Sequence, residues 1–359
     1  MARWIGAGEG GEAPEASLCL LTCFVALSPS LSWLVGCSCL ASKIISRCCD
    51  WLFDEMEDDY VDRDARIKLS IGTKQSGDAD GLLSSPRGLV FDHHRGLLLV
   101  VDTNNHRVQV FSCDDDGGSL VSKLGEEGRQ PGQFKYPWGL AIDHDHDRIL
   151  VTDFRNHRVQ SWSLSEQSFL SCIGRRGSRD LEFKYPQGIA IDKHHRRIVI
   201  TDQFNTRLVF LSSIDLSFLF SIGKQGSQPG EFKYPSSIAI DDDRHRIIVC
   251  DTGHRVQVLS SIDGSFLFEF GSQGAQPGQL LHPQGVCIDN QGRIIVADCY
   301  NYRLQSFNHE GHHISFFDCS REKPHGVAFD EHRGLIAFTA GNQVHVIGAN
   351  QWLADTFSW

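Results

Sequence analysis

Basic and aromatic side chains recur together in three segments of the sequence, each of which ends in proline. The segments are Phe134-Lys135-Tyr136-Pro137, Phe183-Lys184-Tyr185-Pro186 and Phe232-Lys233-Tyr234-Pro235. Lysine and arginine can pair with phosphate or carboxylate groups, and aromatic rings can stack on bases at ~1–3 kcal/mol per base or act as hot spots in protein interfaces. These segments therefore predict a surface that binds either single-stranded nucleic acid or an acidic peptide.

Other candidate residues stand where related segments carry small polar side chains. Phe154-Arg155, Phe204 and Tyr300 are of this kind. The complete predicted partner-binding set is Lys135, Tyr136, Trp138, Phe154, Arg155, Arg175, Arg176, Arg179, Lys184, Tyr185, Phe204, Lys233, Tyr234 and Tyr300. The alternative is structural: the phenylalanines and tyrosines would pack between repeating units, and the lysines would be solvated.

The histidines are concentrated in residues 63–359, many of them at predicted turn tips. The pairs and singles include His93-His94, His144, His146, His194-His195 and His245. Imidazole is a common metal ligand, but a metal site needs several ligands to converge, and these tips belong to different copies of a repeat. We therefore predict solvated turns and neither a metal nor any other cofactor.

Catalysis is not predicted. The residues that follow six regularly spaced prolines would line the axis of the fold, and they are Arg87, Trp138, Gln187, Ser236, Gln284 and His325. One histidine and no carboxylate do not make a site for metal-assisted hydrolysis. No pairing of a nucleophile with a base is evident elsewhere, so the sequence favours a non-enzyme.

Charge and cysteine content restrict the class of protein further. Residues 1–62 hold 3 Lys/Arg and 10 Asp/Glu, whereas residues 63–359 hold 31 and 35, so the second region is close to neutral and gives no bulk argument for nucleic acid. The spacing of the 12 cysteines matches neither paired zinc ligands nor a disulfide framework. Cys172, Cys250, Cys287 and Cys299 are predicted to be small buried hydrophobes in a reducing, cytoplasmic compartment.

The first 49 residues form a hydrophobic, cysteine-rich leader. Residues 16–42 carry no charge and are long enough to span a bilayer, but Pro29 and several serines interrupt them. The preceding residues are acidic, so the positive region of a secretory signal is missing. A disordered segment or doubtful translation start, a membrane anchor and a cleaved signal all remain open. Residues 50–66 are interpreted as an acidic linker.

A repeat organises the rest of the chain. Its period is marked by six prolines spaced 51, 49, 49, 48 and 41 residues apart: Pro86, Pro137, Pro186, Pro235, Pro283 and Pro324. Each copy contains four apolar or alternating runs, which is typical of a propeller blade. The first run begins with Gly or Ser, as expected where strands crowd around an axis; the second is continuously apolar, and the third alternates like a strand further out.

The copies are offset in a way that predicts ring closure. Residues 67–72 match the fourth strand of a blade but have no first, second or third strand before them, and the last copy lacks a full fourth strand. The N-terminal strand should therefore complete the C-terminal blade, which removes the exposed sheet edges. The prediction is an all-β, six-bladed propeller over residues 67–347, followed by a tail at 348–359.

An Asp and an Arg bracket the turn between the second and third strands of most copies. The pairs are Asp102 with Arg107, Asp153 with Arg158, Asp202 with Arg207, Asp251 with Arg255, and Asp298 with Arg303. The Asp can cap the turn and the Arg can pair with it. Since the pairs recur in every complete copy, we interpret them as scaffold.

The repeat resembles the NHL repeat. The resemblance is carried by Pro137 to Asp143, then Ile149 to Asp153, then Asn156-His157-Arg158-Val159-Gln160, and by their counterparts across residues 67–347. It departs in the fourth copy, which lacks the asparagine, and in the sixth, which loses both the Asp, at Thr339, and the Arg. The resemblance implies a six-bladed β-propeller that recognises a partner rather than a catalyst.

NHL propellers commonly serve as the substrate- or RNA-binding end of tripartite-motif ubiquitin ligases, and this leader has no RING finger. The resemblance thus implies binding of a protein or peptide, with recruitment of ubiquitination substrates as one setting. Binding of single-stranded RNA is the alternative. The predicted location is cytoplasmic, with residues 16–42 as an optional membrane anchor.

Overall fold

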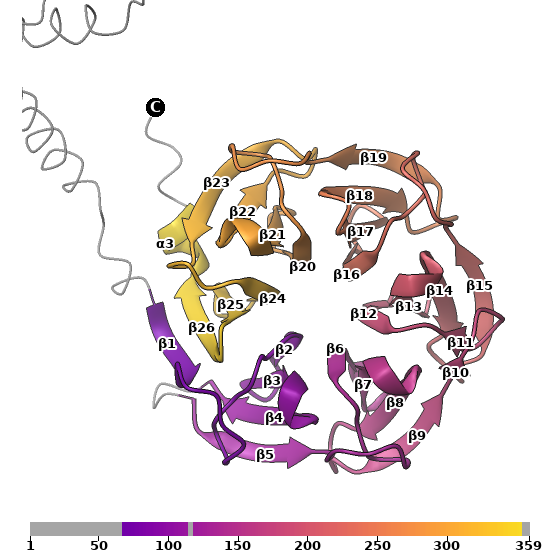
Figure 1. The fold of residues 1–359 in the computed structure, drawn as a ribbon, viewed down its shortest axis with the longest axis vertical. Coiled ribbons are helices and arrows are strands. Elements are labelled where there is room, and N and C mark those ends of the chain that lie inside the picture. Colours follow the sequence, from indigo (N-terminus) through magenta and orange to yellow (C-terminus); the bar gives the residue numbers. More distant parts are fainter. Residues whose placement is uncertain (1–66, 114–117, 354–359) are drawn as a thin grey trace, which may run out of the picture. The chain divides into compact units, whose positions relative to one another are not determined.

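The computed structural model describes residues 67–113 and 118–353. These residues form six four-stranded antiparallel sheets arranged as blades around a central axis (Figure 1). The leader, the linker and the end of the tail lie outside the described residues, and so does the predicted membrane anchor. Within the described part of the chain, no helix is both long and apolar enough to cross a membrane.

The first five blades run from the axis outward in the order of the chain, and the sixth does so for its three inner strands. The innermost strands are β2 (Leu89–Asp92), β6 (Pro137–Asp143), β12 (Pro186–Asp192), β16 (Pro235–Asp241), β20 (Pro283–Ile288) and β24 (Pro324–Asp330). The second strands are β3 (Leu97–Asp102), β7 (Arg148–Asp153), β13 (Arg197–Asp202), β17 (Arg246–Asp251), β21 (Ile294–Asp298) and β25 (Leu335–Ala340). We number the blades one to six in this order.

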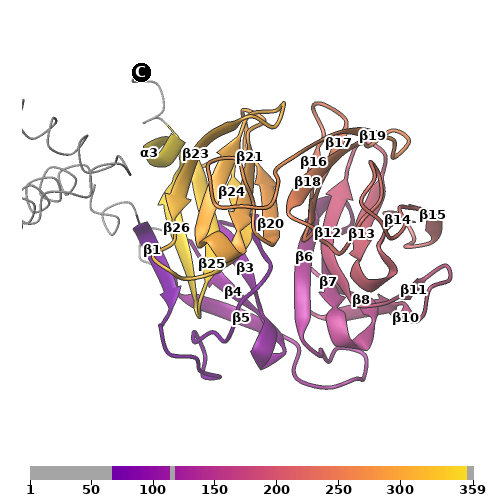
Figure 2. The same cartoon turned by 45° about the horizontal axis from the view of Figure 1, so that its top comes forward.

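The third strands are β4 (Arg107–Ser112), β8 (Arg158–Ser163), β14 (Arg207–Ser212), β18 (Arg255–Ser260), β22 (Arg303–Phe307) and β26 (Gln343–Gly348). The outermost strands are β5 (Leu120–Leu124), β9 (Phe169–Ile173), β15 (Phe218–Ile222), β19 (Phe266–Phe270), β23 (His313–Asp318) and β1 (Ile67–Gly72). Strands run from one face of the ring to the other, so the turns collect on two opposite faces (Figure 2).

The predicted closure of the ring is confirmed. β1 pairs antiparallel with β26, with Ile67 opposite Ile347 and Gly72 opposite Gln343. The N-terminal strand therefore completes the sixth blade, beside the yellow C-terminal strands in Figure 1. A short helix, α3 (Ala349–Leu353), follows β26, and Trp352 is buried against Phe317.

Crowding at the axis explains the small residue at the start of each inner strand. A Cβ added at Gly139 would lie 2.3 Å from the carbonyl oxygen of Gln187 in the next blade. The same close approach recurs at Gly88, Gly188, Gly285 and Gly326, each against the backbone of its neighbour. The prediction of a narrow axis is confirmed.

This packing predicts the effect of a single methyl group. We expect Gly139→Ala to lower the free energy of unfolding by ~1–3 kcal/mol, because overpacking a rigid interior forces backbone shifts. Ser237→Ala is the matched control, since the fourth copy already accommodates a Cβ at this position. Urea denaturation of both variants measures the difference, and equal stabilities would contradict the crowding.

The third strands lie further out than the first two, as predicted, and β4, β8 and β18 are buried along almost their whole length. Their polar positions are buried because they bind the loop through which the chain enters their own blade: Gln160 donates to the carbonyl of Gln133, and its carboxamide oxygen accepts from the N–H of Gly132. The second strands are buried throughout, as predicted.

Candidate functional site

The candidate site lies on the face where each blade's second strand turns into its third and where the chain enters the next blade. Four of these turns are single turns of 3-10 helix: Thr103–Asn105, Phe154–Asn156, Gln203–Asn205 and Cys299–Asn301. The entry loops carry the repeated Phe-Lys-Tyr-Pro segments. Phe134, Phe183 and Phe232 are fully buried beneath these loops. Only the lysines, the tyrosines and the turn tips remain for a partner.

A buried aspartate fixes each entry loop. In the second blade, the Oδ1 atom of Asp153 accepts the N–H of Lys135 at 2.7 Å, and Oδ2 accepts the Nε–H of Arg158 at 2.8 Å. Asn156 and Gln160 donate to the same Oδ2 atom. Burial raises the pKa of Asp153 in spite of these donors. The recurring Asp and Arg therefore hold the loop in place, in agreement with a scaffold role, although the Asp side chain does not cap the 3-10 turn.

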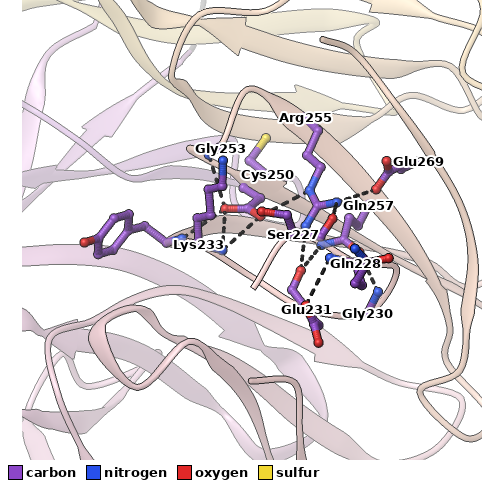
Figure 3. A network of polar contacts seen from close by, with 12 residues as sticks. Ser227, Gln228, Gly230, Glu231, Lys233, Cys250, Gly253, Arg255, Gln257 and Glu269 are labelled. Atoms are coloured by element: carbon purple, nitrogen blue, oxygen red, sulfur yellow. Dashed lines mark hydrogen bonds and ion pairs between the residues drawn. The ribbon is translucent and has the colours of Figure 1, made fainter. Parts of the chain in front are cut away.

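The fourth copy shows how the network adapts to the missing asparagine (Figure 3). Asp251 accepts the N–H groups of Lys233 and Gly253. Arg255 reaches the carbonyls of Ser227 and Glu231, and it also pairs with Glu269 at 2.7 Å. The capping hydrogen bond expected from the sequence is thus made here, at Gly253. The network survives the substitution because the arginine still bridges the blade and the loop.

Two of the candidate tyrosines have an uncommon backbone conformation. Tyr136 and Tyr185 precede proline and have φ angles of 52° and 62°. This left-handed conformation is unfavourable for a bulky residue and persists only where the surrounding structure holds it in place. The Nδ1 atoms of His106 and His157 accept the N–H groups of Tyr136 and Tyr185, at 2.9 and 3.1 Å. Neighbouring blades therefore hold both rings in position.

Five candidate rings form a continuous strip, which we call the aromatic arc. Its ring centroids follow one another at 5.0, 4.8, 4.9 and 5.6 Å in the order Trp138, Phe154, Tyr185, Phe204 and Tyr234. The strip crosses the second, third and fourth blades, since each turn tip meets the entry loop of the following blade. Phe204 and Tyr234 are each 46% exposed, whereas the other three rings are half-buried.

Cations flank the aromatic arc, but not all of the predicted ones are available. The exposed guanidinium of Arg155 lies over Tyr136 at 4.6 Å, and Arg87 lies over Trp138 at 4.7 Å. Arg175 is paired with Glu182 at 2.9 Å, so a carboxylate neutralises it. Arg176 is exposed; burial lowers the pKa of His157, and the charge of Arg176 lowers it further. Arg179, Lys184 and Lys233 lie in the same loops.

Tyr300 lies apart from the arc, in the fifth blade. Its ring is 48% exposed and packs on Lys323, whose Nζ is 3.9 Å from the ring centroid, and on His282. Arg87, His282 and Lys323 were not among the predicted residues. A signal was available, because Arg87 corresponds to Trp138 of the second copy, and His282 and Lys323 both correspond to Tyr136.

A histidine, an arginine and a cysteine meet at the mouth of the central channel on this face. His325 contacts Arg87, and its Nδ1 atom lies 3.6 Å from the sulfur of Cys299. Burial lowers the pKa of His325 to about 3 and raises that of Cys299 to about 11. The pair is therefore an uncharged imidazole and thiol at neutral pH. The small hollow here measures about 50 Å³, and Trp138 and Gln284 also line it.

The pKa of His325 predicts an acid-sensitive fold. An unfolded imidazole takes up a proton near pH 6.5, whereas folded His325 does not until about pH 3, so stability is complete above 6.5 and falls as the pH drops through this window. His325→Gln should reduce the dependence of the melting temperature on pH. Glutamine already occupies the equivalent position in two other blades, at Gln187 and Gln284. Melting temperatures from pH 7.5 to 4.5 test this, with exposed His312→Gln as control. Equal slopes in wild type and His325→Gln would contradict it.

The opposite face corrects one sequence prediction. The histidine tips were expected to be spread around the ring, but His93, His94 and His144 come together with His332, which the sequence interpretation omitted. The inner-strand turns of adjacent blades lie close to the axis, and ring closure makes the first and sixth copies neighbours. His194 and His245 form a second contact, with centroids 4.6 Å apart.

Comparisons with known proteins agree with this architecture. The NHL repeat model matches residues 83–111, 134–161 and 280–307, and a model described as a 6-bladed beta-propeller matches residues 177–260. The chain is 25% identical over 124 residues to NHL repeat-containing protein 2 of Bos taurus, which covers 30% of this chain and 17% of that protein. It is 31% identical over 88 residues to Protein brain tumor of Drosophila melanogaster; this alignment covers 24% of this chain and 8% of that protein.

Solved structures share the fold at low sequence identity. A gluconolactonase of Xanthomonas campestris has a TM-score of 0.58 and 16% identity, over 74% of this chain and 86% of that one. A chain of a nidogen/laminin complex has a TM-score of 0.54 and 16% identity, over 68% and 84%. The alignments span less than a fifth of the lengths of the two sequence relatives. The chain carries NHL repeats, folded as a six-bladed β-propeller.

Proposed function

We propose that the chain is a non-catalytic recognition module that binds a protein or peptide segment across the aromatic arc. The observation that carries the proposal is the unbroken contact of five rings over three blades, with exposed cations beside them. Aromatic side chains and arginine dominate the energetics of protein interfaces. A segment with apolar residues along the arc and acidic residues beside Arg155 and Arg176 fits this surface.

The packing of the rings favours a protein over single-stranded RNA. Adjacent rings of the arc are tilted by 32–60° and share their faces with one another, whereas stacking of successive bases needs free ring faces. Glu182 also neutralises Arg175 in the cluster that would meet phosphate. RNA is therefore the alternative outcome of the experiment below.

A non-catalytic role is supported by the channel mouth. The Xanthomonas campestris gluconolactonase shares the fold, but the side chains at the start of the six inner strands here include no carboxylate. The nearest thiol and imidazole, Cys299 and His325, are both held uncharged by burial. Neither a metal-activated water nor a thiolate nucleophile is favoured at this position.

The setting of this recognition is a further part of the proposal. The resemblance to the recognition end of tripartite-motif ligases suggests that the bound protein is recruited for ubiquitination in the cytoplasm. Residues 1–49 would then be a separate leader joined by the acidic linker, with residues 16–42 able to attach the module to a membrane. Co-purification of a RING-bearing protein with the full chain would support this setting, and its consistent absence would count against it.

The experiment compares capture by three forms of the full chain. Wild type, Phe204→Ala/Tyr234→Ala and the control Phe316→Ala are used as bait in native cytosol, with and without ribonuclease. Phe316 is about as exposed as Phe204 and Tyr234 but lies on the outer strand β23. Loss of a hot spot costs about 2 kcal/mol, so the partner's affinity should fall about 30-fold for the arc variant and stay unchanged for the control.

The same experiment separates the alternatives. Capture that survives ribonuclease and is lost in the arc variant supports protein recognition. Capture that disappears with ribonuclease, together with salt-dependent binding of a random single-stranded RNA pool that Arg175→Glu/Arg176→Glu abolishes, overturns it in favour of RNA. Equal capture by the arc variant and wild type would refute this face as the binding surface.

A further inference from the structure

Four imidazoles converge on the face opposite the aromatic arc. His93 and His94 lie in the turn between β2 and β3, His144 begins the short 3-10 helix His144–His146, and His332 lies between β24 and β25. Ring centroids are 4.2 Å apart for His93 and His94, 4.5 Å for His94 and His144, and 4.5 Å for His93 and His332. Three blades thus contribute to one cluster.

The ligand atoms of this cluster are close enough to share an ion. Those of His93, His94 and His144 lie within 4.8 Å of one another, and so do those of His93, Glu331 and His332. A tetrahedral zinc site has Zn–N distances of about 2.0–2.1 Å, which places its ligand atoms about 3.4 Å apart. A separation of 4.8 Å must therefore shorten by about 1.4 Å when an ion is bound.

A buried carboxylate beside the cluster has no hydrogen-bond donor. Asp92 is fully buried, and among the described residues neither of its carboxylate oxygens accepts a hydrogen bond. Its nearest basic neighbours are Nε of Arg95 at 3.9 Å and Nε2 of His144 at 4.0 Å. Such a group is costly unless a positive charge compensates it.

The other blades show that this is an exception. At the same position, their aspartates accept an arginine N–H at 2.5–2.7 Å: Asp143 from Arg148, Asp192 from Arg197, Asp241 from Arg246, Asp289 from Arg293 and Asp330 from Arg333. In the first blade, Leu97 occupies the place of Arg148, Arg197 and Arg246. Asp92 therefore lacks the short arginine hydrogen bond that the other blades make, and Arg95 approaches it only to 3.9 Å.

The chemistry of the group matches a metal centre with an outer carboxylate. Metal-bound histidines usually donate their second ring N–H to a carboxylate, which fixes the ring and strengthens the ligand. Asp92 can accept this hydrogen bond from Nε2 of His144, which leaves Nδ1 for the metal. Nearby Lys193 contributes an unfavourable positive charge to the cluster.

We propose that His93, His94 and His144 bind one divalent transition-metal ion, Zn²⁺ by ligand chemistry, with Asp92 as the outer carboxylate. Imidazole ligands suit zinc and its neighbours in the first row rather than calcium or magnesium. The ion would join the first blade to the second, beside the sixth blade that closes the ring. A hollow of about 340 Å³, which His93 and Glu331 help to line, opens beside the cluster.

Zinc binding to the full chain tests the proposal. Chelator-treated protein is titrated with Zn²⁺ in competition with a colorimetric chelator, and with Co²⁺ to read the ligand field. We expect wild type to bind one Zn²⁺. The zinc affinity should be at least about 100-fold weaker in His93→Ala and in His94→Ala, whose histidine is exposed. In Asp92→Asn the zinc affinity should be weaker by about 10–100-fold. The cobalt spectrum should show nitrogen ligands without a thiolate charge-transfer band.

Two control variants test whether zinc binds to other histidines of this chain. His194→Ala alters the second histidine contact, and His312→Ala alters an exposed histidine paired with Glu310; both should bind zinc like wild type. In chelator, the melting temperatures of all variants should be the same. Zinc should raise the melting temperature of wild type but not those of His93→Ala and His94→Ala. Unchanged zinc affinity in His93→Ala and His94→Ala would overturn the site, and loss in His332→Ala but not in His144→Ala would overturn this ligand set.

Discussion

Asp153→Ala is expected to lower the free energy of unfolding by about 3–5 kcal/mol, because it leaves the buried guanidinium of Arg158 without its countercharge. The same carboxylate accepts the N–H of Lys135, so its removal also frees the loop that presents Tyr136. Urea denaturation monitored by circular dichroism measures the first effect. Partner capture on the arc is expected to weaken in parallel.

Two further variants isolate the cause. Asp180→Ala removes an exposed carboxylate from the next entry loop and should change stability by less than about 0.5 kcal/mol. Asp153→Ala/Arg158→Met removes both charges, so it should recover part of the loss. If the double variant is no more stable than Asp153→Ala, the unpaired charge is not the cause of the destabilisation.

Deletion of residues 1–72 is expected to abolish the folded monomer. Without β1, the whole length of β26 becomes an unpaired edge, and the buried face of Ile71 is lost from the core. An exposed edge of this kind invites pairing with other chains. Size-exclusion chromatography and thermal denaturation should show aggregation and no cooperative transition.

The control is a deletion that stops short of the strand. A chain beginning at Arg66 keeps β1 and corresponds to the compact unit Arg66–Trp359. It should remain monomeric and unfold cooperatively. A well-folded monomer from the longer deletion would mean that the sixth blade is stable with three strands, contrary to the role assigned to the closure.

Much of the fold could be predicted because it depends on local repetition. The proline period and the offset of residues 67–72 determine the number of blades and the seam without any knowledge of distances. The burial of the third strands could not be predicted in this way. It depends on Gln160 and its counterparts reaching a loop 27 residues away along the chain, which no alternating pattern reveals.

The candidate surfaces depend more strongly on three-dimensional neighbours. Variation among the copies identified Phe154 and Phe204, and the repeated Phe-Lys-Tyr-Pro segments identified Tyr185, but only the ring geometry shows that they touch. The histidine cluster was missed for a related reason: His93 and His332 are distant in sequence and become adjacent only when the first and sixth blades meet. Convergence at an axis is a property of the closed ring and not of any single copy.

The pairing of β1 with β26 also determines how the propeller responds to force. Ile67 lies opposite Ile347, so the chain enters and leaves this strand pair at the same end. Tension between the two ends would therefore separate the hydrogen bonds one after another, like a zipper, instead of shearing them together. All six blades contribute to the stability of the ring against heat and denaturant. The force needed to open the ring by pulling on its ends depends on the pairing of β1 with β26 alone.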